Sequence, residues 1–410
     1  FARGSYRSAL VRLSGVDPAA WVDGAPRAAL AVQIELQPLG DSPSELVGRL
    51  ALVNRLAGTV DRQRLPLESL RSDLRLSGGE LSLSALDAEL LGGGRLQGSG
   101  RWQTDELALS LNAARLDAAV LHGALRRTQL AGALRATLAL HRQTLAVDLR
   151  DARFAVAARM IADPAVLLVE GMRLSAGKAE LRVDGRLALS GERAFAARGS
   201  LHDFDPSAFA RLPTARLNAT FDAEGHAVPL ALKLAFALRD SRFHGQPLAG
   251  RGALEIVGRR LSQVAIELSA AGNRLTANGA FGAPSDRLNV VVAAPKLDSL
   301  GIVGDLDGRV LLGGTLAAPT LSGELRALRL VLPGLGELRG LQAQANLGEG
   351  AQGALAGQLR LASYTRAGGA GVFSGLSIEV EGVRGAHRLR AQAALAGELF
   401  SALAEPTLMI

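Results

Sequence analysis

The stretch LALKLAFAL, from Leu230 to Leu238, places a large apolar residue at every second position and continues into RDSRF, which ends at Phe243. Successive side chains point to opposite sides of a β-strand, so this period of two indicates a strand with one apolar face. An amphipathic helix would instead need apolar spacings of three and four. We therefore predict a strand whose leucines share one side.

The same alternation recurs along the chain and predicts a sheet with one aliphatic face. Turn signals such as Ser77-Gly78-Gly79-Glu80, Asp184-Gly185 and Asn278-Gly279 arrive about every 9 to 14 residues, which is typical of an all-β chain. The 48 glycines suit such turns better than they suit long helices. The residues predicted to lie on the aliphatic face are Leu74, Leu76, Leu81, Leu83, Leu107, Leu109, Leu111, Leu145, Val147, Leu149, Leu187, Leu189, Leu230, Leu232, Leu234, Phe236, Leu238, Val264, Ile266 and Leu268.

A six-residue phrase repeats at a nearly constant interval. LRDARF begins at Leu149, LRDSRF at Leu238 and the weaker LRALRL at Leu325, so the copies are 89 and 87 residues apart. We expect this phrase to mark the end of a strand. Regular internal repetition is typical of stacked architectures in which each unit relies on its neighbours.

An apolar residue followed by Asp recurs in phase with this phrase, at Asp17, Asp117, Asp205 and Asp298. At Asp17 and Asp205 this helix N-cap residue precedes Pro at the first helical position. We predict brief helices of one or two turns here, with a structural rather than a chemical role for the aspartates. Together the landmarks predict a single continuous repeat array over residues 1–410, with units of roughly 90 residues at about 17–116, 117–204, 205–297 and 298–410.

Composition restricts the classes of protein and site. Hydrophobic residues make up 48% of the chain but aromatic residues only 4%, so Leu, Val and Ala must build the apolar surface. The absence of Cys excludes disulfides, Cys-ligated metals and Cys nucleophiles. There is no run of about 18 apolar residues that would predict a membrane-spanning helix. The chain begins with Phe1 rather than Met, and we interpret it as a segment of a longer protein.

The net charge of +7 does not by itself indicate nucleic-acid binding. Nearly all basic residues are Arg, and most stand singly between apolar residues, with no run longer than Arg126-Arg127 or Arg259-Arg260. Aromatic residues that could stack on bases are scarce. We therefore expect no nucleic-acid partner, and a diffuse positive surface near anionic lipid fits the pattern at least as well.

No arrangement of residues indicates catalysis or a bound cofactor. The six His residues show no His-Glu-x-x-His pattern and no pair at metal-ligand spacing. No Gly-x-Ser-x-Gly elbow occurs, and the phosphate-loop-like segment from Gly171 has Ala179 where a hydroxyl residue is required. Carboxylates alternate with Arg, which predicts a charge ladder on a hydrated face. We predict no enzyme activity, no metal site and no cofactor.

An aliphatic sheet face must be covered by a second sheet, by closure into a barrel, or by folding lengthwise into a trough. The first two arrangements normally use interior aromatic residues, which are scarce here. We therefore predict an elongated, repetitive antiparallel sheet folded lengthwise into a hydrophobic groove. Such a groove would bind hydrocarbon, because each methylene that moves from water into it gains about 0.8 kcal/mol of free energy. Uniform side chains would let an acyl chain slide, and Arg and Asp at the rim would keep headgroups in water.

Several phrases spread over nearly the whole chain resemble one protein family. They are GGGRLQGSGRWQTDELALSLNAARLD from Gly92, NRLTANGAFGAPSDRLNVVVAAPKLDSLG from Asn273 and GRVLLGGTLAAPTLSGELRALRLVLPGLGELRGLQAQANL from Gly308. The segment VEGVRGAHRLRAQAAL is similar to the family's Gly-x-x-x-x-His strand pair, here Gly382 to His387. In their order and density these phrases resemble the TamB family, within the AsmA-like superfamily of Gram-negative bacteria.

The resemblance implies a β-taco, the trough-shaped β-structure of the family. It implies a central periplasmic segment of a protein that is tethered to the inner membrane by an N-terminal anchor outside this chain. It further implies a TamA-like outer-membrane barrel as a partner, reached through a region that need not belong to this chain. Phospholipid movement between the membranes and outer-membrane protein assembly are the functions implied, and no catalytic residues are carried over.

We therefore predict a periplasm-spanning bridge segment whose aliphatic groove carries phospholipid acyl chains between the inner and outer membranes, in support of outer-membrane biogenesis. The alternative is a scaffold or chaperone-like surface that adds β-strands of outer-membrane proteins to open sheet edges during assembly or secretion. A secreted β-solenoid adhesin fits less well, because adhesins favour Asn, Thr and aromatic residues.

Overall fold

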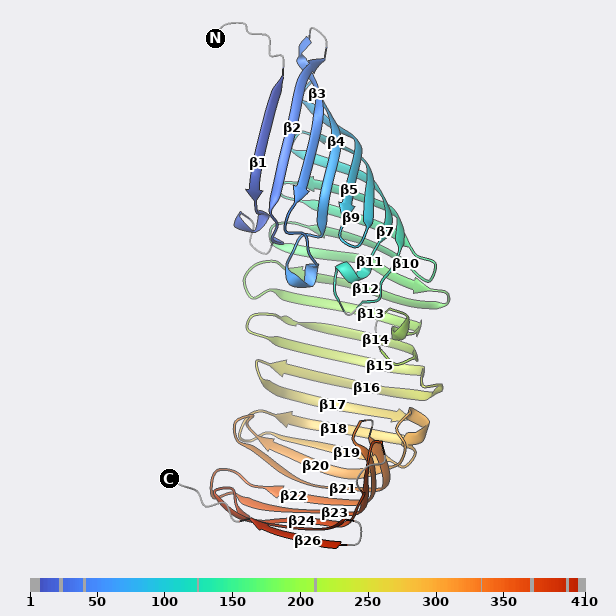
Figure 1. The fold of residues 1–410 in the computed structure, drawn as a ribbon, viewed down its shortest axis with the longest axis vertical. Helices are drawn as coiled ribbons and strands as arrows, with labels where there is room; N and C mark the ends of the chain where they lie inside the picture. Colours follow the sequence, from blue (N-terminus) through green and yellow to red (C-terminus); the bar gives the residue numbers. More distant parts are fainter. Residues whose placement is uncertain are drawn as a thin grey trace. The chain divides into compact units, whose positions relative to one another are not determined.

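The structure is a computed structural model and describes residues 8–21, 25–39, 42–123, 125–209, 212–332, 334–368, 372–395 and 398–404. Its contacts divide the chain into two compact units. Unit 1 comprises residues 1–190 and 204–213, and unit 2 comprises residues 191–203 and 214–410. Both units consist almost entirely of β-strands (Figure 1), so the prediction of an all-β chain with a few short helices is confirmed.

In unit 1 each strand pairs antiparallel with the next one along the chain, so the strands form one sheet in sequence order. Antiparallel neighbours need only short connections, which explains the regular turn signals. Within the described residues of this unit, no ladder joins the last strand to the first, so the sheet is open. The strands are β1 (Ala9–Val16), β2 (Leu30–Leu39), β3 (Ser42–Asn54), β4 (Leu67–Ser77), β5 (Glu80–Leu90), β6 (Gly94–Gln103), β7 (Glu106–Leu116), β8 (Leu130–Ala139), β9 (Gln143–Arg150), β10 (Ala155–Ala162), β11 (Val166–Ala176) and β12 (Ala179–Ala188).

Unit 2 repeats this plan. From β14 onward each strand again pairs antiparallel with its successor. The strands are β13 (Ala194–Phe204), β14 (Ala215–His226), β15 (Ala231–Phe243), β16 (Gln246–Val257), β17 (Arg260–Ala270), β18 (Asn273–Phe281), β19 (Arg287–Ala294), β20 (Leu306–Gly314), β21 (Pro319–Leu332), β22 (Gly336–Leu347), β23 (Ala354–Arg366), β24 (Val372–Val383), β25 (Ala386–Leu395) and β26 (Glu398–Ala404).

Short 3-10 helices interrupt the strands at regular places. They are η1 (Pro18–Ala20), η2 (Val60–Arg62), η3 (Ala118–Val120), η4 (Pro206–Ala208) and η5 (Leu297–Leu300). In the order of the described elements, six strands separate η1 from η3, six separate η3 from η4, and six separate η4 from η5. The short helices predicted after Asp17, Asp117 and Asp205 are therefore confirmed, whereas Asp298 lies within η5. The division into units of about 90 residues stays a prediction.

The aspartates before η1, η3 and η4 cap the first turns of these helices. Asp17 Oδ1 accepts hydrogen bonds from the backbone N–H of Ala19 and of Ala28, both at 3.1 Å. Asp117 Oδ1 accepts in the same way from Ala119 at 3.0 Å and Thr128 at 3.1 Å. Each carboxylate therefore also closes a loop of eleven residues. The structural role predicted for these aspartates accounts for their recurrence.

Replacing Asp117 with Ala should lower the free energy of opening of this loop by about 1 kcal/mol, because two backbone N–H groups lose their acceptor. Hydrogen exchange at Ala119 and Thr128 measures this loss. Asp117→Asn keeps one side-chain oxygen and should retain most of the protection. Equal protection in the Ala variant and the parent chain would contradict the capping role.

The repeated six-residue phrase adopts two different structures. Its first copy, from Leu149, ends β9 and forms the turn into β10, as expected of a strand end. Its second copy, from Leu238 to Phe243, forms the last six residues of β15 and contains a bulge, so it also lies at a strand end. The buried Ser241 hydroxyl donates to the carbonyl of Asn218 at 3.0 Å and accepts from its N–H at 2.8 Å. These bonds to the neighbouring strand allow β15 to continue.

Candidate functional site

A row of apolar residues crosses the sheet of unit 1 without a polar interruption. Residues directly opposite each other in an antiparallel ladder point to the same face, so the register defines the row. Read from β1 to β12, the row is Leu13, Val32, Leu52, Leu70, Ala88, Leu96, Ala113, Gly132, Leu149, Val156, Leu174 and Leu181.

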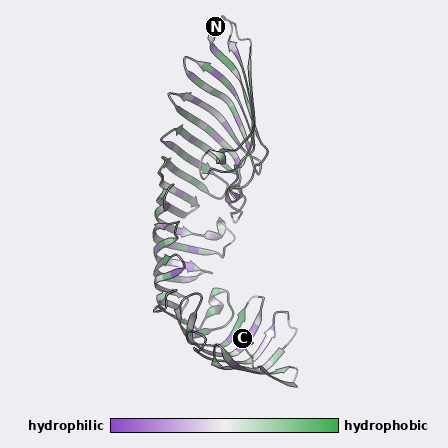
Figure 2. Ribbon diagram, turned by 90° about the vertical axis from the view of Figure 1, so that its left-hand side faces the viewer, coloured by the Kyte–Doolittle hydropathy of each residue, from purple (hydrophilic) through white to green (hydrophobic). Residues whose placement is uncertain are grey.

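Unit 2 carries an equivalent row. Read from β14 to β25, it is Phe221, Phe236, Gly252, Ile266, Ala277, Val290, Val310, Gly323, Ala345, Gly357, Val380 and Leu389. We call the side of each sheet that carries its row the apolar face. Figure 2 shows the resulting alternation of hydrophobic and hydrophilic residues along the strands.

The register places the predicted aliphatic residues on the apolar faces, with two exceptions. Leu189 lies beyond the end of β12 and is 41% exposed, and Leu230 precedes β15 and is 50% exposed. The other predicted residues lie on β4, β5, β7, β9 and β12 in unit 1, and on β15 and β17 in unit 2. Their role in lining a lipid groove stays a prediction.

The predicted set omitted many members of the two rows. Val290 lies in the row of unit 2, but the run Val290-Val291-Val292 hides which of its residues face which side. Val310 and Leu311 are adjacent apolar residues with the same ambiguity. The pairing between strands identifies them. Ile266 in β17 lies opposite Ala277 in β18, and Ala277 lies opposite Val290 in β19, so all three share one face.

Exposure alternates with the same period as hydropathy. In β7 the neighbouring alanines Ala113 and Ala114 differ, since Ala113 on the apolar face is only 5% exposed while Ala114 on the other face is exposed. In β17, Val264 is 5% exposed while its neighbours Gln263 and Ala265 are exposed. The apolar face is therefore the better shielded side, although the strands of each unit form a single layer.

The opposite side of each sheet, the polar face, carries cross-strand ion pairs. Arg95 in β6 lies 3.0 Å from Asp87 in β5, and Arg251 in β16 lies 3.1 Å from Glu267 in β17. These side chains are substantially exposed, so each pair adds at most about 1 kcal/mol to stability. Their main consequence is a charged, hydrated surface to which hydrocarbon does not bind.

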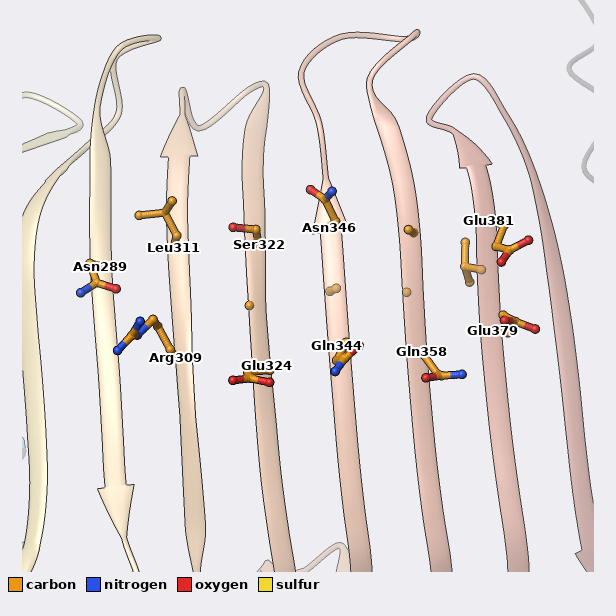
Figure 3. Close-up of a pocket in the computed structure, with 15 residues that line it drawn as sticks. Asn289, Arg309, Leu311, Ser322, Glu324, Gln344, Asn346, Gln358, Glu379 and Glu381 are labelled. Atoms are coloured by element: carbon orange, nitrogen blue, oxygen red, sulfur yellow. The ribbon is translucent and has the colours of Figure 1, made fainter.

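A hollow of about 630 Å³ lies over the polar face of unit 2, between β19 and β24 (Figure 3). Its lining residues include Arg309, Glu324, Gln344, Gln358 and Glu379, which alternate in sequence with the apolar row. Amide and charged groups form much of the lining of this hollow, together with apolar residues such as Leu311 and Val380. It is therefore distinct from the hydrocarbon site that the sequence predicts.

An aromatic cluster closes one end of the apolar face in unit 1. Phe154, the residue before β10, is buried together with Ala113, Leu130 and Leu149. The ring of Phe209, the residue after η4, packs edge-on against Phe154 with 5.3 Å between the ring centroids. The short helix thus places an aromatic side chain against the ends of the strands.

The carboxylates with lowered pKa values in the described residues include Asp286 and Asp151, and the causes are structural. The Arg260 guanidinium lowers the pKa of Asp286 by donating two hydrogen bonds, at 2.8 and 2.7 Å. The pKa of Asp151 is lowered chiefly by the backbone N–H of Gln129, which donates to it at 2.7 Å. Both carboxylates hold connections between strands, so these shifts do not indicate acid–base chemistry.

Within the described residues, no group of three or more His, Cys, Asp or Glu side chains is arranged to hold a metal ion. In the same part of the chain, no helix has the length and apolar character that a membrane crossing requires. The feature that distinguishes this molecule is therefore its pair of uninterrupted apolar rows.

A family model matches a large part of the chain. It is described as TamB, N-terminal domain, and it covers residues 167–404, which is more than half of the sequence. No curated protein matches the chain.

Proposed function

Since the chain belongs to the TamB family, we propose that it is a segment of a periplasmic bridge whose apolar face carries phospholipid acyl chains between the inner and outer membranes. A TamA-like barrel is the outer-membrane partner of this bridge. The transport supports outer-membrane biogenesis. The observation that carries the proposal is the apolar row that crosses the strands of each unit without a polar residue.

The dimensions of the row suit an acyl chain. Neighbouring strands lie about 4.8 Å apart, and the hydrocarbon core of a bilayer is about 30 Å thick for two leaflets. One acyl chain of about 15 Å therefore covers three to four strands. A row that crosses twelve strands in each unit offers several successive positions, made mainly of aliphatic residues.

The energetics suit movement along the row. Each methylene that leaves water gains about 0.8 kcal/mol, so an acyl chain is held without a specific pocket. Because Leu, Val, Ala and Gly repeat along the row, one position differs little from the next. The ion pairs of the polar face leave water-facing groups on the other side, so hydrocarbon is confined to one face.

Native mass spectrometry of the detergent-free chain tests the proposal. We expect copurified phospholipid on the parent chain and its loss in Ile266→Asp/Val290→Asp, which adds two charges to the apolar row. The matched control is Ala265→Asp/Val291→Asp, which adds the same charges to the adjacent polar-face positions of β17 and β19. A parent chain free of lipid, or equal lipid on both variants, would contradict the proposal.

Strand addition is the second candidate function, and the edge strand β1 favours it. Among the described strands, β1 pairs only with β2. Its residues Leu10, Val11 and Leu13 are 51%, 44% and 50% exposed. An exposed apolar edge can accept a further strand through main-chain hydrogen bonds. Binding of unfolded barrel protein that proline in β1 abolishes, and that Ile266→Asp/Val290→Asp leaves unchanged, would identify this function.

A further inference from the structure

Four connections of unit 1 meet at the same end of its strands, beside the apolar row. Three of them contain η1, η2 and η3 (Figure 1), and the fourth joins β9 to β10. We call this surface the arginine rim and define it as the described residues 17–21, 25–28, 55–65, 117–123, 125–129 and 151–154. The row crosses each strand close to this end, as Leu149 near the end of β9 and Val156 near the start of β10 show.

Backbone hydrogen bonds hold the segments of the rim together, although they are far apart in sequence. The N–H of Arg27 donates to the carbonyl of Gln63 at 2.8 Å, which joins the η1 connection to the η2 connection. The N–H of Asp61 donates to the carbonyl of Leu121 at 3.1 Å, which joins η2 to η3. Arg153 Nη2 donates to the carbonyl of Arg127 at 3.2 Å. The rim is therefore one continuous surface.

Positive charge exceeds negative charge along the rim. Its arginines are Arg27, Arg55, Arg62, Arg64, Arg126, Arg127 and Arg153, and its aspartates are Asp17, Asp61, Asp117 and Asp151. The excess is three charges. Within the described part of the chain, Arg27, Arg64 and Arg127 form no ion pair, whereas Arg153 lies 4.0 Å from Asp151.

The four aspartates are engaged by the backbone. Asp61 accepts from the N–H of Gly123 at 3.1 Å, and Asp151 accepts from Gln129 at 2.7 Å. Asp17 and Asp117 cap η1 and η3, as described above. These carboxylates hold the connections in place. Among the described residues, Arg27, Arg64 and Arg127 form no ion pair with them. Guanidinium groups in this setting are available to an anion.

Apolar side chains accompany the arginines. Trp21, Val60 and Leu121 are 74%, 44% and 56% exposed, and each belongs to or adjoins one of the three short helices. Arg153 directly precedes the buried Phe154, and the N–H of Arg126 donates to the carbonyl of Phe209 at 3.0 Å. Cationic groups thus lie beside the aromatic cluster at the end of the apolar face. A ligand with an anionic head and a hydrocarbon tail could place its head on the arginine rim and its tail on the apolar face.

We propose that the arginine rim binds the phosphate of a phospholipid headgroup and makes the chain prefer anionic phospholipids over zwitterionic ones. This inference rests on the proposed lipid-carrying function and specifies its substrate class. The tail lies on the apolar row while the head stays in water at the rim. Net positive charge favours a headgroup with net negative charge, and the preference weakens with added salt.

A competition experiment on the full chain tests the preference. The detergent-free protein is incubated with vesicles of equal phosphatidylglycerol and phosphatidylethanolamine, and native mass spectrometry reads the ratio of the two bound lipids. The rim variant is Arg62→Gln/Arg64→Gln/Arg127→Gln. The matched control, Arg71→Gln/Arg135→Gln/Arg186→Gln, removes the same charge from the polar face of the same unit.

We expect the parent and the control to be enriched in phosphatidylglycerol, and the rim variant to lose at least about fivefold of that enrichment while total bound lipid is unchanged. Raising the salt to about 0.5 M should reduce the enrichment of the parent. An unbiased parent, or a rim variant that keeps its bias, would overturn the inference and leave the proposed function standing. Absence of both lipids would overturn the proposed function itself.

A soluble phosphate is separated from a lipid headgroup by a second measurement. Glycerol phosphate is added to the lipid-free parent chain and to the rim variant, and the thermal unfolding midpoint is recorded. The lipid assignment predicts no shift in either protein, because the tail supplies most of the binding. A shift confined to the parent, with no lipid retained from vesicles, would identify a soluble phosphate site and overturn the assignment.

Discussion

Phospholipid should crosslink to a photoreactive p-benzoylphenylalanine at position 236 and not to one at position 235. Phe236 lies in the apolar row of unit 2 and is opposite Phe221 and Gly252. Ala235 is the next residue along β15 but lies on the polar face, where it is exposed. The two probes therefore share a strand and differ only in the face that they sample. Crosslinked lipid in membrane extracts from cells that express the chain is the readout.

Two charges on the apolar face next to the row should abolish the crosslink at position 236. Leu232→Asp/Leu234→Asp places two carboxylates on the apolar face of β15, both on the N-terminal side of Phe236, and we expect the yield to fall at least about tenfold. The reason is that an unpaired charge in an apolar environment costs several kcal/mol. Ala235→Asp/Ala237→Asp adds the same charges to the polar face of the same strand and should leave the yield nearly unchanged. Equal yields in the two variants would show that hydrocarbon does not follow this face.

Gly279→Ala should open the ladder between β18 and β19. Gly279 has φ +124°, a conformation that residues with a Cβ rarely adopt, and an added Cβ would overlap the carbonyl oxygen of Arg287. Because that oxygen belongs to the backbone of the neighbouring strand, relief requires the strands to separate. We expect the free energy of local opening to fall by about 2 kcal/mol or more. Hydrogen exchange in peptides from β18 and β19 reports the loss.

Gly357→Ala is the matched control for this experiment. Gly357 also lies on the apolar face of unit 2, but the nearest atom to an added Cβ is 3.8 Å away and its φ is ordinary. Its substitution should change the free energy of local opening by less than about 0.5 kcal/mol. If both variants exchange like the parent chain, the close approach at Gly279 does not constrain the sheet.

Several functional features lay beyond sequence reasoning because they depend on where strands bulge. In β5 the residues facing the apolar side are Leu81 and Leu83, but beyond a bulge at Ala85, which has φ 47°, they are Leu86 and Ala88. A bulge adds one residue to one strand and so reverses the parity of every position after it. Counting alternate residues therefore places Leu81 and Leu83 on the apolar face correctly but misses Leu86 and Ala88 beyond the bulge.

The sequence alone determined that this chain is made of strands, that each strand has an aliphatic side, and where aspartates cap short helices. These properties follow from side-chain periodicity and from hydrogen bonds within about eleven residues, which are local. Only the tertiary structure decided which residues join one row, and that Arg27, Arg62 and Arg127 share a rim. Those arrangements depend on ladder register and on backbone hydrogen bonds between loops such as Asp61 to Leu121, which no local pattern encodes.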